Sequence, residues 1–293
     1  MPKQAEPIVK QGAHLGEGAL WDHVDEVLYW VDILGCKVFQ YEPQGGENRA
    51  FDVRHHVGTV VVRNSGGLLV ALQPGIACLD PETGHTEMLV KIPEVDAAAR
   101  FNDGKCDPEG RFWVGTLTYK FEKGAAALYR IGPDLKWTKM LDGITCSNGI
   151  VWSGDRNTMY YIDTPTRKVE AFDFDLRTGN ITTRRTVVNV PEEKGWPDGM
   201  AIDSQDRLWV AMFGGGRVCG FNPKTGQLIG EILIPGAKNI TSCAFGGPAF
   251  TDLYITSAKE HLKPDDLKAQ PNAGHLFHCK MEVPGVPAYE FVG

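Results

Sequence analysis

The sequence lacks the features of several large protein classes. Its seven cysteines are an odd number with no C-x-x-C pair, so we expect reduced thiols in a cytoplasmic protein. No signal segment stands at the N-terminus, and no run approaches the roughly 18 apolar residues that a membrane span needs. Lys and Arg form no cluster, and the formal charge is −7. We therefore expect neither a nucleic acid nor a membrane as partner.

Two common catalytic motifs are missing as well. The chain has no G-x-S-x-G elbow of a serine hydrolase and no G-x-x-x-x-G-K-[ST] phosphate loop. Gly214-Gly215-Gly216 is followed by a strand pattern, which favours a hairpin turn over a phosphate site. No long stretch has a helical period, although residues 261–270 could form a single helical turn.

Glycine is abundant, with 34 residues beside 18 prolines, and the chain repeats. Six apolar triplets each follow a polar turn and precede another short strand pattern. Their middle residues are spaced by 40, 44, 48, 48 and 45 positions, close to the period of a propeller blade. The triplets are Leu28-Tyr29-Trp30, Leu68-Leu69-Val70, Phe112-Trp113-Val114, Tyr160-Tyr161-Ile162, Leu208-Trp209-Val210 and Leu253-Tyr254-Ile255.

This repeat predicts an all-β fold, a six-bladed β-propeller with four antiparallel strands per blade. Residues 1–293 are expected to form a single domain, and a β-sandwich is the alternative. We expect the N-terminal EPIVKQ (6–11) and the C-terminal AYEFV (288–292) both to pair into the last blades, which would close the ring.

Polar residues recur just before four of the apolar inner strands, which converge on one mouth of a propeller channel. Two carboxylates crowded there would repel each other unless a divalent cation neutralised them, and amide oxygens would complete its shell. Each motif alone is a common turn pair, but four at one phase of a repeat predict a metal site. The motifs are Glu17-Gly18, Asn102-Asp103-Gly104, Asn148-Gly149 and Asp198-Gly199.

Longer motifs around these residues resemble a known family over nearly the whole chain. It is the senescence marker protein / gluconolactonase / luciferin-regenerating enzyme family, which includes regucalcin. The resemblance implies a six-bladed propeller with one divalent metal ion, calcium first and Zn, Mn, Mg or Fe as alternatives. The motifs are GEGALWD (16–22), RFNDGKCDPEGRFWVGT (100–116), SNGIVWS (147–153), YYIDT (160–164), PDGMAID (197–203), LWVAMFGGGRV (208–218), TSCAFGG (241–247) and LYITSA (253–258).

Residue by residue, the resemblance implies Glu17, Asn148 and Asp198 as direct metal ligands. Asn102 would lie at the metal or one shell out and touch substrate, and Arg100 would hydrogen-bond substrate. The segment after Thr116 is short for a lid of this family, and Tyr119 or Glu122 could supply its substrate contact. For His55-His56 the expectation is a loop or a strand end.

The function implied is hydrolysis of small sugar lactones by a monomer or weak homodimer. The metal would polarise the lactone carbonyl, and Asp198 would be the general base that activates a water. A calcium-binding regulatory protein and an organophosphate or aryl-ester hydrolase are the alternatives. A pure ion binder has no use for Arg100, which favours the enzyme.

Overall fold

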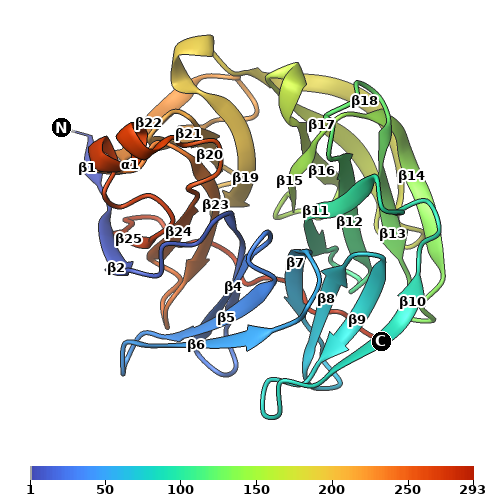
Figure 1. Cartoon of the computed structure of the whole chain (residues 1–293). Helices are drawn as coiled ribbons and strands as arrows, with labels where there is room; N and C mark the ends of the chain where they lie inside the picture. Colours follow the sequence, from blue (N-terminus) through green and yellow to red (C-terminus); the bar gives the residue numbers. More distant parts are fainter. Residues whose placement is uncertain (1) are drawn as a thin grey trace.

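The computed structural model describes residues 2–293, and its strands form six sheets arranged radially around a central channel (Figure 1). This is the predicted six-bladed β-propeller. All six apolar triplets lie in the second strand of a blade, as the repeat requires. Each sheet is packed between two others, and that explains why both faces of these strands are buried.

The first three blades are continuous in sequence. Blade one consists of β3 (Gly16–Asp22), β4 (Val27–Asp32), β5 (Lys37–Glu42) and β6 (Glu47–Asp52). Blade two consists of β7 (Val57–Val62), β8 (Leu68–Leu72), β9 (Gly75–Leu79) and β10 (Thr86–Lys91). Blade three consists of β11 (Ala99–Cys106), β12 (Phe112–Thr118), β13 (Ala126–Ile131) and β14 (Trp137–Ile144).

The last three blades follow the same order from the channel outward. Blade four consists of β15 (Ser147–Trp152), β16 (Thr158–Asp163), β17 (Lys168–Asp175) and β18 (Asn180–Asn189). Blade five consists of β19 (Trp196–Ile202), β20 (Leu208–Phe213), β21 (Arg217–Phe221) and β22 (Leu228–Leu233). Blade six takes β23 (Ile240–Gly246), β24 (Asp252–Ser257) and β25 (Leu276–Lys280) from the C-terminal part.

The N-terminal segment closes the ring. β2 (Glu6–Val9) pairs antiparallel with β25 and is the fourth strand of blade six, which confirms the prediction for EPIVKQ. β1 (Lys3–Gln4) adds a parallel fifth strand to blade five beside β22. A strand from the N-terminal end thus completes a sheet of C-terminal strands and covers the edge of β25.

The prediction for the C-terminal AYEFV is wrong, because this segment does not pair into the last blades. Phe291 instead forms an isolated bridge with Arg63 of blade two, and its side chain is fully buried. Val292 donates a backbone hydrogen bond to Gly110 of blade three. Prolines at 284 and 287 lack the N–H that a ladder needs, so the tail runs irregularly over the blade ends.

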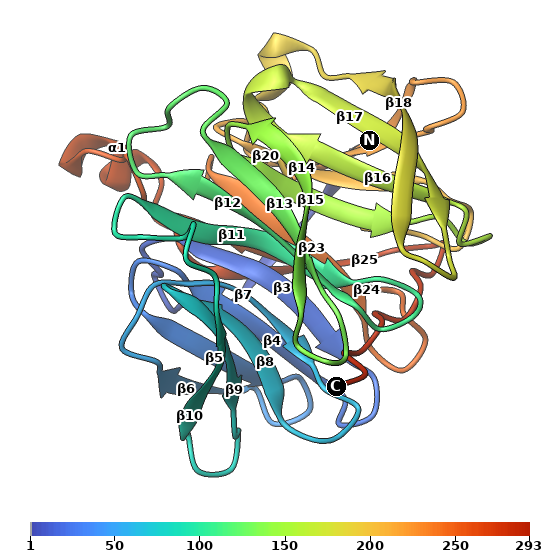
Figure 2. The ribbon, with the colours of Figure 1, turned by 90° about the vertical axis from the view of Figure 1, so that its right-hand side faces the viewer.

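Helices are few and lie between strands. α1 (Pro264–Ala269) confirms the predicted helical turn in residues 261–270, and it projects from one side of the ring (Figure 2). Two short 3₁₀ helices, η1 (Thr164–Thr166) and η2 (Glu192–Lys194), precede β17 and β19. Within residues 2–293, none of the helices has the length and apolar character to cross a membrane.

Candidate metal centre

Every inner strand carries a β-bulge at the same point. In β15, Ser147 pairs with Asp163 and Ile150 with Tyr161, so three steps on the inner strand match two on its partner. The other five inner strands shift register in the same way. A bulge leaves residues unpaired and re-aims their side chains. The unpaired positions are 18–19, 58–59, 102–103, 148–149, 198–199 and 241–242.

The predicted polar residues lie at these bulges. Asn102, Asn148 and Asp198 are each the first unpaired residue, and Glu17 directly precedes the bulge of β3. Gly149 allows the close approach, because a Cβ there would lie 2.8 Å from the backbone oxygen of Asp198. The inner strands therefore bring these side chains together at one mouth of the channel.

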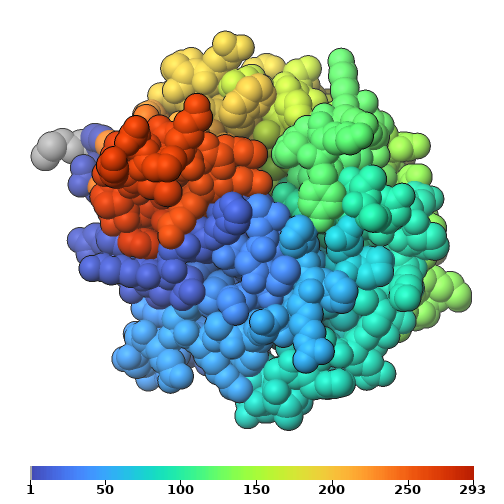
Figure 3. All heavy atoms as spheres, viewed as in Figure 1, coloured from blue at the N-terminus to red at the C-terminus, as the bar shows by residue number. Residues whose placement is uncertain are grey.

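A cavity of about 270 Å³ opens at this mouth. The space-filling view in Figure 3 shows the six blades meeting on this face. Five predicted residues line the cavity, and all five are at most 6% exposed: Glu17, Arg100, Asn102, Asn148 and Asp198.

The two carboxylates are short of partners. Asp198 Oδ1 is buried without a hydrogen bond, and Glu17 accepts one bond, from the N–H of Gly18 at 3.0 Å. Burial, followed by the charge of Asp103, raises the pKa of Glu17 from 4.5 to about 8. Burial and the charge of Glu17 raise the pKa of Asp198 well above its usual range. Buried anions of this kind fit a cation that would replace the missing partners.

The donor set also limits which cation fits. Within residues 2–293, no three or more His, Cys, Asp or Glu side chains form a group that could hold an ion. A cation here would therefore use two carboxylates together with amide oxygens and water. Hard oxygen ligands of this kind suit Ca²⁺, Mg²⁺ or Mn²⁺ better than a structural Zn²⁺.

Hydrogen bonds hold the amide of Asn148 at both its nitrogen and its oxygen. Its Nδ2 donates to Thr164 Oγ1 at 2.7 Å, and Thr164 donates to the backbone oxygen of Pro197 at 2.8 Å. Asn102 Nδ2 donates to Asn148 Oδ1 at 2.9 Å, while Asn102 Oδ1 accepts from Arg100 at 2.6 Å. In this arrangement Asn102 orients Asn148 and Arg100, and its own oxygen is already used.

Arg100 is a buried cation without an anionic partner. Its Nη1 donates to Asn102 Oδ1 and, at 3.0 Å, to the backbone oxygen of Phe101. In the part of the chain that the structure describes, Arg100 makes no salt bridge. A buried guanidinium is costly unless it is paired, so this group is suited to a negatively charged oxygen of a ligand.

Aspartates at the ends of second strands hold the loops that enter the inner strands. Asp32, the last residue of β4, accepts the N–H groups of His14 and Leu15 at 2.9 Å. Asp163, at the end of β16, accepts the N–H of Cys146 at 2.9 Å. The backbone just before Glu17 and Asn148 is thereby fixed, which supports the geometry of both side chains.

The remaining predicted contacts lie farther out. The hydroxyl of Tyr119 is 2.5 Å from His56 Nδ1 and 3.2 Å from Gln73 Oε1, and Tyr119 is not among the residues that line the cavity. His55 and His56 lie in the loop before β7, which confirms the loop expectation. Glu122 is exposed beside Tyr119 in the loop between β12 and β13.

Several cavity residues were missed by the sequence analysis. Thr164 is the last residue of the YYIDT motif, and the sequence analysis assigned it no role. Glu260 and His261 follow β24 outside any repeated position, so no periodic signal marks them. The rest of the lining is apolar: Leu15, Leu117, Phe121, Cys146, Pro165, Trp196 and Phe213.

Comparison with known proteins decides the family. The family described as SMP-30/Gluconolactonase/LRE-like region matches residues 15–259, well over half of the chain. The protein belongs to this family. Xenopus laevis regucalcin is 36% identical over 294 residues, with 98% of each chain covered. The Bacillus subtilis protein named "Putative sugar lactone lactonase YvrE" is 37% identical, with 96% of each chain covered.

A solved structure agrees with this assignment. The protein described as a calcium-binding protein, regucalcin, from Agrobacterium tumefaciens superposes with a TM-score of 0.94. It is 28% identical, and the match covers 99% of this chain and 98% of that one. The family and the propeller fold are therefore established independently of the site residues.

Proposed function

We propose that this protein is a metal-dependent lactonase that opens sugar lactones of the aldonolactone type. The observation that carries the proposal is that one cavity holds both a carboxylate and a guanidinium whose charges lack partners. Among residues 2–293, a buried oxygen of Asp198 has no hydrogen-bond partner and the buried guanidinium of Arg100 has no salt bridge. Gluconolactonases in the family name and the lactonase name of the Bacillus subtilis relative support the same reaction.

Glu17, Asn148 and Asp198 would hold the cation, with Asn102 beside them. Calcium is our first choice, and Zn, Mn, Mg and Fe are alternatives. A divalent cation bound there would act as a Lewis acid on the lactone carbonyl and offset the charge that develops on its oxygen. The calcium-binding description of the Agrobacterium relative is consistent with this choice.

Asp198 would act as the general base. It accepts a proton from the water that attacks the carbonyl carbon, the ring C–O bond breaks, and the ring oxygen takes up a proton. Arg100 is placed to hydrogen-bond the anionic oxygen of the intermediate, a role that typically contributes about 100-fold or more in rate.

Two alternatives use the same residues. A calcium-binding protein without catalysis would need the carboxylates but would gain nothing from a buried Arg100. An organophosphate or aryl-ester hydrolase would need the cation and Arg100 for a P=O or C=O group. Relative kcat/KM on lactones and on phosphotriesters distinguishes this last function from the proposed one.

The test is lactone hydrolysis by metal-stripped protein, and proton release is the measured signal. Glucono-, galactono- and xylono-lactones are each assayed after adding back Ca²⁺, Mg²⁺, Mn²⁺, Zn²⁺ or Fe²⁺ singly. We expect metal-restored turnover that Asp198→Asn abolishes, while Asp142→Asn on the exposed outer strand β14 leaves it unchanged. Tight cation binding without turnover for any combination of lactone and cation would refute the lactonase proposal and leave the ion-binding alternative.

A further inference from the structure

The wall of the cavity above its polar floor is largely apolar. We call this wall the apolar collar, and it comes from blades one, three, four and five. Its residues leave a cavity that is polar where the carbonyl would be held and apolar where the rest of a substrate would lie. The collar consists of Leu15, Leu117, Phe121, Pro165, Trp196 and Phe213.

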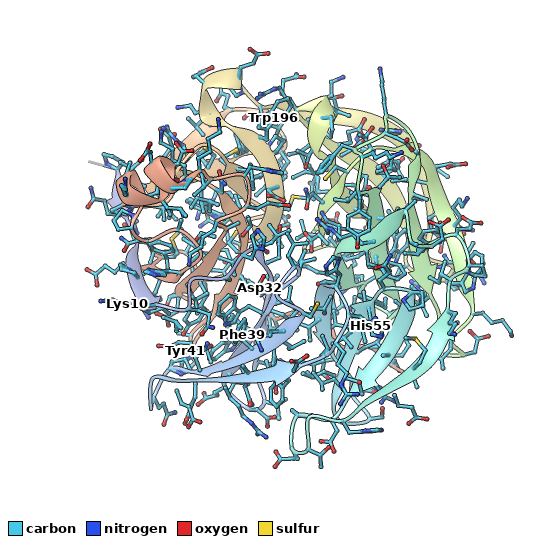
Figure 4. The ribbon with its side chains drawn as sticks, viewed as in Figure 1. Lys10, Asp32, Phe39, Tyr41, His55 and Trp196 are labelled. Atoms are coloured by element: carbon cyan, nitrogen blue, oxygen red, sulfur yellow. The ribbon has the colours of Figure 1, made fainter. Side chains whose placement is uncertain are left out.

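The collar presents exposed aromatic surface. Phe121 is 48% exposed and Trp196 is 42% exposed, and they line the cavity from blades three and five. Figure 4 labels Trp196 on the side of blade five. In residues 2–293 the one other exposed Phe, Trp or Tyr is Tyr119, which is 39% exposed and lies two residues before Phe121. Exposed aromatic surface concentrated at one cavity mouth indicates a binding role.

Two rings of the collar, Trp196 and Phe213, each have a partner that holds them in place. The guanidinium of Arg167 lies over Trp196, 3.6 Å from the ring centroid, and Arg167 also donates to the backbone oxygen of Gly195 at 2.9 Å. Phe213 packs edge-on against His261 with centroids 6.3 Å apart. Phe121 has a φ of 52°, a left-handed conformation that bulky residues rarely adopt.

Polar groups at the level of the collar offer a substrate few hydrogen bonds. Thr164 Oγ1 is already bonded to Asn148 and Pro197, and the hydroxyl of Tyr119 is bonded to His56 and Gln73. Glu260 and His261 are the remaining polar residues, and both lie on the side of blade six. A hydroxyl group seated against Phe121 and Trp196 would therefore lose water without a replacement partner, so an apolar substituent is favoured at that place. Glu260 and His261 remain in the lining for the hydroxyl groups of a sugar lactone.

We propose that the protein has a second substrate class, lactones whose ring carries an aryl or alkyl substituent. The substituent is seated between Phe121 and Trp196 while the carbonyl lies over the polar floor. The inference rests on the proposed lactonase function, and the reaction is the same. Water adds to the carbonyl carbon, the ring C–O bond breaks, and the product is a hydroxy acid that releases a proton at neutral pH.

The test compares three δ-lactones on the protein loaded with each candidate cation in turn. They are unsubstituted δ-valerolactone, its analogue with a phenyl group on the carbon next to the ring oxygen, and glucono-δ-lactone. We expect the phenyl lactone to exceed δ-valerolactone in kcat/KM. Phe121→Ala and Trp196→Ala should each lower that kcat/KM about tenfold, with δ-valerolactone changed less than about twofold. Ile229→Ala, equally exposed but on the outer strand β22, is the matched control.

The outcomes separate the two proposals. Hydrolysis of glucono-δ-lactone without a preference for the phenyl lactone, or equal losses on both unhydroxylated lactones, overturns the collar inference alone. No hydrolysis of any lactone with any cation overturns the lactonase and the inference together. Because Phe121 and Trp196 come from different blades, either variant carries the test if the other fails to fold.

Discussion

Replacing Glu17 by glutamine is expected to stabilise the cation-free protein while weakening its cation site. The Glu17 carboxyl is 4% exposed and lies near the buried carboxyls of Asp103 and Asp198. Without a cation, ionised Glu17 has lost its water and faces like charge, so folding opposes its ionisation. The neutral amide removes this cost but also removes a ligand.

The magnitude follows from the pKa of Glu17, which folding raises from 4.5 to about 8. A raised carboxyl pKa contributes stability below 4.5, and that contribution is lost as the pH rises toward 8. At pH 7 the unfolded chain has lost this proton over 2.5 pH units, while the folded protein keeps most of it. At 1.36 kcal/mol per unit the free-energy cost is about 3 kcal/mol. For a chain of this length, that corresponds to about 5 °C in Tm.

The assay is thermal unfolding in EDTA at several pH values between 5 and 8. Glu17→Gln should raise Tm by about 5 °C at pH 7, less at pH 5, and excess Ca²⁺ should stabilise the wild type more than the variant. Glu47→Gln, on the exposed outer strand β6, is the matched control and should change neither curve. A variant no more stable than the wild type at pH 7, with an unchanged pH dependence, would refute the reasoning.

Three further substitutions test separate parts of the structure. Thr164→Val should weaken cation affinity about 10-fold to 100-fold, measured by calorimetry, because Asn148 loses the partner that orients it; unchanged affinity would deny Thr164 that role. Arg100→Ala should lower lactone kcat/KM at least about 100-fold yet preserve cation binding, and loss of both would indicate a structural role. Phe291→Ala should cost about 3–5 kcal/mol of unfolding free energy, against less than about 0.5 kcal/mol for the exposed Val292→Ala; similar values would contradict the buried C-terminal anchor.

The fold could be predicted largely because a propeller repeats. Six triplets at nearly constant spacing marked the second strand of every blade, and turns with fixed chemistry separated them. The chain ends were harder, because they lie outside the repeat. β2 completes blade six, but Phe291 is anchored at Arg63 of blade two, a contact between residues far apart in sequence that no local pattern encodes.

The candidate site was predicted in its polar floor and missed in its wall. Asn148 and Asp198 each precede a glycine at the same position of the repeat, so the sequence predicts that both lie at the start of an inner strand. Phe121 comes from a loop outside the repeat. Trp196 lies two residues before the first unpaired residue of its strand, the position that Arg100 and Cys146 hold in blades three and four, but the residue type there changes from blade to blade. Loops differ from blade to blade, and they determine what surrounds the floor. The sequence repeat therefore does not predict which substrate the cavity accepts.

The bulges explain why the position of a residue within the repeat predicts its place at the channel mouth. Each inner strand leaves two residues unpaired at the same height, so the first unpaired residue of every blade is a structurally equivalent position. Glu17 is the exception, since it precedes that position by one residue. Gly18 occupies the position itself with a φ of 58°, and its N–H donates to the Glu17 carboxylate. Blade one thus supplies its carboxylate from a neighbouring residue, and Gly18 adopts the left-handed conformation at the bulge without strain.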